Sequence, residues 1–417
     1  MTAQPEPQAG PLPHPPFLAT LPFRLALRLY APGDIRATAQ QLTAFRDFAT
    51  AGDPLADAVV AMFRRLPPGR GRALFEQAVE HGIGALPEPP PELVDFFAHV
   101  DAVPYWLDPD RLAHGVRTQA RTGLYAGVVV LPGLSLYGGY LASRIDKVLL
   151  RTGDLESMAP RRLAETATWT TDLVAPGGLD RFGPGFKGIL RVRLMHALVR
   201  RGLSRRPDWD FAAWDHPVNQ IQLAGTLLQF SLMALTGTRA LGLRFSARDK
   251  AGLFHFWRYI GHVMGIDPRL LPATEADAWR LLWLVAATEL QPDEDAGRLA
   301  GALLSAMPGY ALPARWQRSA RARHALTAYV GSYSRLVLGK DNADRLGAPD
   351  SKAFQAAVLA TTALTFGVET LRRLTPGGTR LAARVGYLSI RRMVDRGMRD
   401  HHGDLAFDRH DRLPGAA

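Results

Sequence analysis

Helical periodicity constrains this chain more than any other feature of its sequence. The clearest instance is Lys187–Leu203, in which Val192, Met195 and Val199 recur at i, i+3 and i+7. That spacing places the three side chains on one face of a helix and predicts a buried apolar stripe. No segment alternates polar and apolar residues over any length. We therefore expect an all-α protein.

A histidine lies on the same stripe between two arginines. His196 has Arg193 at i−3 and Arg200 at i+4, so one edge of the helix carries an imidazole between two guanidinium groups. An imidazole can bind iron and arginines can pair with carboxylates, so the arrangement fits a haem held through its metal and its carboxylate arms. The alternative, and the commoner case, is a core histidine on a helix whose arginines face water.

A preceding helical segment adds further polar side chains at regular spacing. Ala159–Leu173 carries Arg162 and Thr166 one turn apart, and Asp146 lies upstream in the sequence SRIDKVLL. The sequence RLMHALVR surrounds His196, and WDHPVNQ follows it. This series resembles the latex-clearing-protein and MpaB-type rubber oxygenase family.

The resemblance is clearest over residues 146–230 and continues more weakly to residue 338. It implies a b-type haem (haem b) whose iron has His196 as its proximal ligand. Arg162 and Thr166 would lie on the distal side, and Asp146 would be the catalytic base. It also implies a globin-like helical core with additional helices at both ends. The reaction would be dioxygenase-type cleavage of carbon–carbon double bonds in an apolar, isoprenoid-like substrate by O2.

Two positions depart from the family pattern. Members that cleave rubber carry a lysine directly before the motif threonine, which can cap the iron when substrate is absent, and Glu165 holds that position here. Their base is a glutamate, whereas Asp146 is shorter by one methylene group. The resemblance therefore implies the same cofactor with a different resting state, five-coordinate or water-bound. Its substrate need not be polymeric rubber.

The absence of cysteine excludes several kinds of site. The chain has no cysteine, so it forms no disulfide, no iron–sulfur cluster and no thiolate-ligated haem. The covalent attachment of c-type haem is excluded for the same reason. Any haem must be held without thioether links, in agreement with a histidine-ligated b-type haem.

The net charge of +11 does not by itself indicate nucleic-acid binding. It is spread along the chain and comes mostly from arginine. Residues 379–399 alone are densely basic, and they lack the interleaved aromatic residues that favour nucleic acid. We expect a solvated helix that covers the core and no nucleic-acid partner, with peripheral contact to an anionic membrane as the alternative.

Breaks rich in proline and glycine between the helical segments predict the domain layout. We expect a flexible Pro-rich tail at 1–20, an N-terminal helical extension at 21–104, a haem-binding oxygenase-like core at 105–338, and C-terminal helices and a tail at 339–417. No secretory signal is visible near the start, so we expect a cytoplasmic protein. The oligomeric state cannot be predicted from these features.

Two uncharged runs are long enough to suggest membrane spans. Pro132 and several glycines break the first run, 122–143, and Asn219 is one of several amides in the second, 216–238. We expect both runs inside a helical bundle, and 353–374 as a further buried helix.

Three functional hypotheses follow. The first is the haem-dependent oxygenase, an oxidoreductase. The second is a helical haem or isoprenoid carrier or sensor that keeps His196 but has no turnover. The third is a membrane-associated helical protein without haem. No metalloprotease, phosphate-loop or serine-hydrolase motif competes with them in a usable context.

Overall fold

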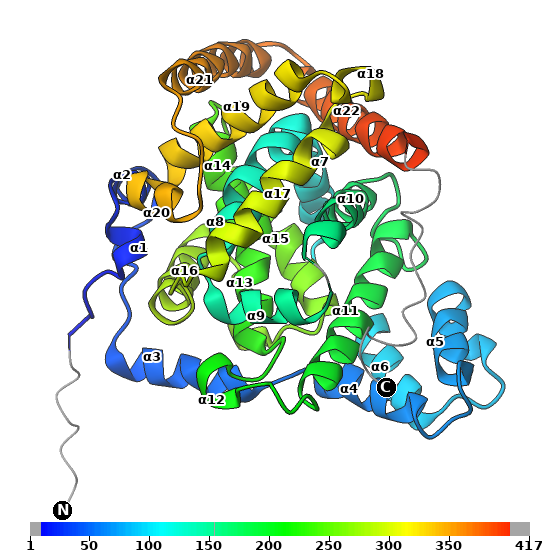
Figure 1. The fold of residues 1–417 in the computed structure, drawn as a ribbon. Coiled ribbons are helices and arrows are strands. Elements are labelled where there is room, and N and C mark those ends of the chain that lie inside the picture. The colour runs from blue at the N-terminus through cyan, green and yellow to red at the C-terminus, as the bar shows by residue number, and fades with distance from the viewer. Residues whose placement is uncertain (1–9, 154, 401–417) are drawn as a thin grey trace, which may run out of the picture.

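The structure is a computed structural model that describes residues 10–153 and 155–400. Every regular element in this part of the chain is a helix, and no β-strand occurs in it (Figure 1). The all-α prediction is confirmed, with additional helices on both sides of the core. A globin-like order of the core helices stays a prediction.

The helices are joined mostly by short connections. In chain order they are α1 (Pro16–Ala19), α2 (Leu21–Tyr30), α3 (Ala39–Arg46), η1 (Asp47–Thr50), α4 (Pro54–Phe63), α5 (Arg70–His81), η2 (Ile83–Ala85), α6 (Pro91–Asp101), α7 (Pro109–Leu124), η3 (Tyr125–Leu136), α8 (Tyr137–Gly139), α9 (Ser143–Arg151), α10 (Leu155–Leu173), α11 (Pro184–Leu203), α12 (Phe211–Trp214), α13 (Gln220–Leu228), η4 (Gln229–Met233), α14 (Ala234–Ala240), α15 (Ala247–Val263), η5 (Pro268–Leu270), α16 (Glu275–Thr288), α17 (Asp295–Ala311), α18 (Ala314–Gln317), α19 (Ala320–Leu338), α20 (Lys340–Arg345), α21 (Lys352–Leu374) and α22 (Gly378–Asp400). The elements η3 and η4 are π-helical, and the other η elements are 3₁₀ turns.

Helix α7 crosses two other helices at pairs of glycines. Gly115 meets Gly252 of α15, where a Cβ atom on Gly115 would collide with the carbonyl group of Gly252. Gly123, with a φ of +46°, meets Gly386 of α22, and a Cβ there would lie 2.9 Å from the Cα atom of Gly386. Glycine permits both the unusual φ and the close approach of backbones. The C-terminal helix α22 is thereby packed against the centre of the molecule.

One hydrophobic core runs through most of the described chain, from Phe17 to Val394. Helix α4 packs on α11 and joins the N-terminal helices to this core. The flexible tail predicted at residues 1–20 does not extend to residue 20, because Phe17 and Leu18 are buried in the core. Residues 1–9 and 401–417 of the two predicted tails lie outside the described residues. The predicted domain boundaries at residues 104 and 338 do not interrupt the core and stay predictions.

The apolar runs have different outcomes. The second run forms α13, η4 and α14 and is mostly buried, as predicted, whereas the first reaches the surface near Tyr125. Among the described residues, Pro109–Gly139 and Lys352–Leu374 are long and apolar enough to cross a membrane. The most apolar window of the first is 56% buried, but that of α21 is only 17% buried. The prediction that 353–374 forms a buried helix is wrong, because α21 turns its polar side inward.

Candidate active site

Asp146 lies on α9 and is fully buried. Its exposed fraction is 0%, and neither carboxylate oxygen has a hydrogen-bond partner in the described part of the chain. Burial raises the pKa of Asp146 well above its ordinary value, and the nearby carboxylates of Asp293 and Asp295 raise it further against the opposing charge of Lys147. Burial therefore favours the protonated form of this side chain.

Tyr140 interacts electrostatically both with this carboxyl group and with Arg162. Burial raises the pKa of Tyr140 to about 12, with a further contribution from the charge of Asp146. Burial lowers the pKa of Arg162, and its interaction with Tyr140 opposes that shift. The guanidinium of Arg162 donates a hydrogen bond to Thr152 Oγ1 at 2.8 Å. The structure therefore connects Asp146 and Arg162 through Tyr140, a residue that was not among the predicted site residues.

Thr166 and Glu165 make local contacts along α10. The hydroxyl of Thr166 donates to the carbonyl oxygen of Arg162 at 2.8 Å, one turn back in the same helix. Glu165 forms an ion pair with Arg161 at 2.9 Å, also one turn back. The carboxylate that replaces the family lysine is thus held along the helix surface by a cation of its own helix.

His196 on α11 has an unpaired ring nitrogen. The imidazole is half-buried, and its Nδ1 atom is buried without a hydrogen-bond partner among the described residues. Burial lowers the pKa of His196 to about 4, the positive charge of Arg200 lowers it further, and Asp53 opposes the shift. The imidazole is therefore neutral at physiological pH, the state in which its nitrogen can bind a metal.

The two arginines that flank His196 are engaged elsewhere. Arg193 pairs with Asp53 through Nε at 2.6 Å and Nη2 at 2.9 Å, and its third nitrogen donates to the carbonyl oxygen of Val263 at 3.0 Å. Arg200 pairs with Asp57 at 2.8 Å and donates to the carbonyl oxygen of Val218 at 2.7 Å. Both arginines fasten α11 to its neighbours, and these contacts do not favour their predicted role as cofactor-binding residues.

The buried face of α11 is not the predicted one. Ile189, Arg193 and Ala197 belong to the face that is buried. Val192 and Val199 are only half-buried, and Met195 is 44% exposed. The prediction of a fully buried stripe is wrong because the arginines, paired with acids from α4, take the interior position.

The predicted stripe faces α10 instead. A Cβ atom on Gly188 would lie 3.1 Å from the ring of Trp169 on α10, and Val192, Met195 and Val199 continue the face of Gly188 at helical spacing. The two helices touch near their connection, but this face is no longer covered at Met195. The contact between Gly185 and Leu173, together with that between Gly188 and Trp169, shows that the two helices run antiparallel near their connection.

The family motif WDHPVNQ has a structural role. Asp215 pairs with Arg46 at 2.7 Å and with Arg144 at 3.3 Å. The side chain of Asn219 caps α13, and Gln220 donates to the carbonyl oxygen of Gly52 at 2.7 Å. The motif therefore ties the N-terminal helices to the core beside α11.

An apolar cavity of about 50 Å³ lies between α8, α9, α13, η4 and α16. Ile145, the neighbour of Asp146, is one of its lining residues. Gln222 also lines it, is 4% exposed, and has both amide atoms unpaired among the described residues. Gln222 is one of the amides in the run 216–238 that argue against a membrane span, and its place at this cavity was not predicted.

Residues 110–368 match the family described as ER-bound oxygenase mpaB/B'/Rubber oxygenase, catalytic domain. The chain belongs to this family. The match includes all six predicted site residues, Asp146, Arg162, Thr166, Arg193, His196 and Arg200.

Two individual proteins show how far the likeness to this family extends. The chain is 25% identical over 190 residues to the rubber oxygenase of Streptomyces sp. (strain K30), a match that spans 44% of this chain and 46% of that protein. The chain thus covers less than half the length of this relative. A solved structure of latex clearing protein in the closed state superposes with a TM-score of 0.62 over 83% of this chain and 91% of that one, at 20% identity. At that identity the superposition shows a shared fold.

Proposed function

We propose that this member of the mpaB/rubber oxygenase family is a haem b-dependent oxygenase that cleaves carbon–carbon double bonds of an apolar, isoprenoid-like substrate with O2. The observation that carries the proposal is the neutral imidazole of His196. It has an unpaired ring nitrogen, and it lies on a helix that packs beside α10 and whose face toward α10 is incompletely covered.

The residues present fit a haem better than a bare metal ion. No group of three His, Asp or Glu side chains in the described chain could hold an ion together. A single imidazole suits an iron whose other positions are filled by a porphyrin, and bound haem would supply the centre that binds and activates O2. Because Arg193 and Arg200 are already paired with acids, propionates would need other partners.

The side chains of α10 would act on bound O2, whereas His196 on α11 would bind the iron. Arg162 provides a positive charge that stabilises negative charge developing on oxygen. The hydroxyl proton of Thr166 is used within its own helix, so its oxygen is free to accept a hydrogen bond and its donor role requires a rotation. Glu165 offers no nitrogen to the iron and is held by Arg161. We therefore expect a high-spin resting state that binds CO readily once reduced.

Asp146 would hold and move a proton at Oδ1 or Oδ2. Burial raises its pKa, so its carboxylate would be a stronger base toward an allylic C–H bond than that of an exposed aspartate. Tyr140 stays protonated beside it and can donate a hydrogen bond. The nearby apolar cavity, with the unpaired amide of Gln222, supports an apolar substrate that carries at most a few polar atoms.

Haem reconstitution tests the proposed ligand. Wild-type protein should show a Soret band, and His196→Ala should lose it while keeping its helical circular dichroism. His262→Ala is the matched control, because burial also lowers the pKa of His262 to about 4 and its Nε2 atom has no partner in the described chain. A colourless wild type, or loss of haem in His262→Ala but not in His196→Ala, would overturn the assignment.

Oxygen uptake separates an oxygenase from a carrier. A carrier has no catalytic step that would need the unpaired carboxyl group of Asp146. In an oxygenase, Asp146→Asn should abolish O2 consumption with an isoprenoid probe and leave haem content and CO binding intact. A haem-loaded wild type that consumes no O2 with short isoprenoids or carotenoid-like alkenes would favour the carrier.

A further inference from the structure

Helix α21 is inverted relative to an ordinary surface helix. Thr365 and Glu369, both polar, are among its few buried residues, with exposed fractions of 3% and 6%. Leu364 and Leu374 are 70% and 77% exposed. A soluble helix normally buries its apolar stripe and exposes its polar one, so this arrangement needs an explanation.

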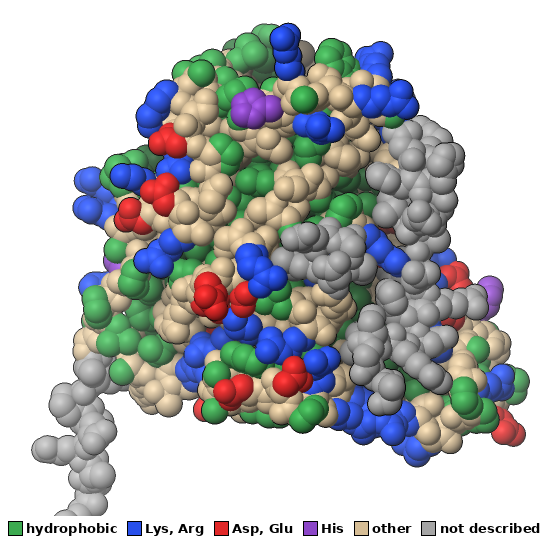
Figure 2. Space-filling model, in the orientation of Figure 1, with side chains coloured by type: hydrophobic (Ala, Val, Ile, Leu, Met, Phe, Trp, Pro, Cys, Tyr) green, Lys and Arg blue, Asp and Glu red, His purple; other side chains and the backbone are tan. Residues whose placement is uncertain are grey.

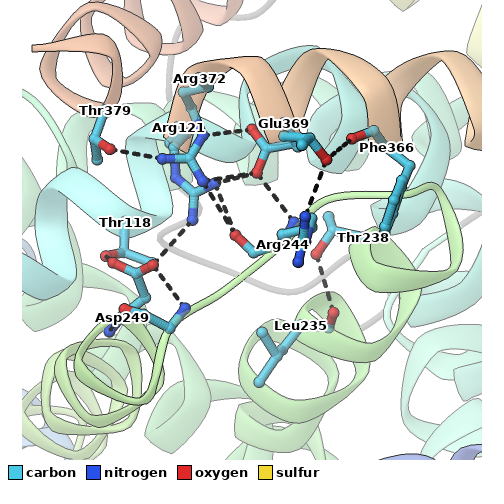
Figure 3. Close-up of polar contacts among 12 residues, drawn as sticks. Thr118, Arg121, Leu235, Thr238, Arg244, Asp249, Phe366, Glu369, Arg372 and Thr379 are labelled. Atoms are coloured by element: carbon cyan, nitrogen blue, oxygen red, sulfur yellow. Dashed lines mark hydrogen bonds and ion pairs between the residues drawn. The ribbon is translucent and has the colours of Figure 1, made fainter. Parts of the chain in front are cut away.

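A buried ion-pair network holds the polar side inward (Figure 3). Glu369 accepts hydrogen bonds from Arg121 at 2.7 Å, from Arg372 at 2.8 Å and from the backbone N–H of Arg244 at 3.0 Å. Thr365 donates to the phenolic oxygen of Tyr125 at 3.0 Å. These contacts fix the rotation of α21, so its leucines face outward because the polar side is fastened inward.

The outward side is a continuous apolar face. On α21 it comprises the exposed residues Leu359, Leu364, Phe366, Val368, Leu371 and Leu374. The first turns of α22 add Leu381 and Val385, which are also exposed. Large exposed apolar patches are uncommon on soluble proteins and mark contact with a partner or a membrane.

Helix α2 presents a second exposed apolar stripe near α21. Leu21, Leu25 and Leu29 are exposed at i, i+4 and i+8. Both helices contact the last two residues of α14. Tyr30, at the end of α2, lies under the guanidinium of Arg239 at 4.6 Å. Thr362 of α21 donates a hydrogen bond to the carbonyl oxygen of Ala240 at 3.0 Å.

The exposed charges on α21 and on the first turns of α22 are positive, whereas α20 and the connection before α21 carry the exposed residues Asp341, Asp344 and Asp350. Glu369 is the one acidic residue between positions 352 and 392, and it is buried in the network. Arg373, Arg380 and Arg384 are exposed beside the apolar face, and Arg24 is exposed on α2. Lysine and arginine side chains stand among hydrophobic ones at the upper end of the molecule in Figure 2, where Figure 1 places α21.

We propose that α21, the first turns of α22 and α2 form a docking surface for an anionic lipid membrane, with α21 lying in the plane of the interface. Leucines that enter the acyl boundary beside arginines at headgroup level are the features of an interfacial helix. A second copy of the chain would bring one positive rim against another. Insertion of α21 across the bilayer would require Glu369 to leave three donors for hydrocarbon.

Vesicle sedimentation with the full-length protein tests this proposal and requires no oxygenase activity. Wild-type protein should bind vesicles of phosphatidylcholine mixed with phosphatidylserine, bind phosphatidylcholine alone much more weakly, and lose binding as salt is raised. Arg373→Gln with Arg384→Gln should weaken binding to the mixed vesicles roughly 30-fold, since each arginine near an anionic surface contributes about 1 kcal/mol. Leu364→Gln with Leu371→Gln should weaken it by about tenfold or more.

Matched controls come from the opposite end of the molecule. Arg70→Gln with Arg205→Gln removes two exposed arginines of α5 and of the segment after α11, and Val103→Gln removes an exposed apolar side chain after α6. Both should bind like wild type. No binding of wild type to the mixed vesicles, or an equal loss in the controls, would overturn the proposal. So would a dimer, seen by analytical ultracentrifugation, that Leu364→Gln with Leu371→Gln dissociates.

Discussion

Helices α11 and α21 both bury charged side chains, but α11 buries an arginine among apolar residues such as Leu190, whereas the few buried residues of α21 include Thr365 and Glu369. On α11, Arg193 is buried against Asp53, and the apolar side faces α10 next to His196. On α21, Glu369 is buried against Arg121, and the apolar side faces outward. On α21 a distant ionic partner holds the polar side inward, whereas on α11 the ion pairs act together with buried apolar side chains. The side of α11 that faces α10 lines a candidate ligand site, whereas the outward side of α21 forms a candidate docking surface.

The largest effect should come from breaking the ion pair that orients α11. Asp53→Asn removes the charge that faces Arg193 but keeps a side chain able to cap α4, where Asp53 accepts from the backbone N–H of Ala56. The free energy of unfolding should fall by about 3–5 kcal/mol, because Arg193 would stay buried without a counter-charge. Urea unfolding followed by circular dichroism measures this.

Asp57→Asn is the control for that variant, on the same helix. Asp57 pairs with Arg200, but its side chain is 39% exposed, so the loss should be about 1 kcal/mol or less. If both variants lost the same free energy of unfolding, burial would not determine how much each ion pair contributes to stability.

Breaking the ion pair that orients α21 should have the next largest effect. Glu369→Gln should lower the free energy of unfolding by about 2–4 kcal/mol, because Arg121 and Arg372 lose a shared counter-charge. Adding Arg121→Met should recover part of that loss by removing one unpaired cation. A double variant less stable than the single one would contradict the coupling.

Asp146 tests the case of a buried carboxyl group with no ionic partner. Its pKa is raised in the folded protein, so folding binds a proton, and its contribution to stability falls as pH rises from the unfolded value toward the folded one. Asp146→Asn should therefore gain stability relative to wild type as pH rises above the ordinary pKa of an aspartate. Unfolding measured from pH 5 to pH 8 checks the sign.

Asp249→Asn should show the opposite trend, and only at acidic pH, below the ordinary pKa of an aspartate, so its unfolding must be followed below pH 5. Burial alone would raise the pKa of Asp249, but the hydrogen bond from Ser246 and the charge of Arg121 lower it. Its contribution to stability is present above the unfolded pKa and is lost as pH falls through the folded one. The same trend in both variants would contradict the predicted electrostatics of Asp146.

The smallest effect should come from the apolar side of α21. Leu371→Gln should change the free energy of unfolding by no more than about 0.5 kcal/mol, because the side chain is exposed. Leu190→Ala on the buried side of α11 should cost about 2–5 kcal/mol. A large loss in Leu371→Gln would show that its side chain is covered by protein in solution.

Much of the fold and part of the candidate site follow from local sequence. The spacing of apolar residues predicted helices throughout, and the series from Asp146 through Arg162 to His196 indicated the family. These features are local, since a helix and its motif spacing depend on residues a few positions apart. Tyr140 gave no such signal, because it lies in the turn before α9 and becomes a neighbour of Asp146 and Arg162 only in the folded chain.

The sequence by itself determined that the chain is helical and that it has no site that depends on cysteine. It also showed that His196 stands at the position of the histidine in the family motif. Only the tertiary structure decided which side of each helix is buried. Periodicity measures where apolar residues lie around a helix, but an arginine or a glutamate can be buried when its partner lies more than a hundred residues away, as Asp53 does from Arg193 and Arg121 from Glu369. Such a pair gains its stability from desolvated charge contact that exists only after the distant segments have packed together.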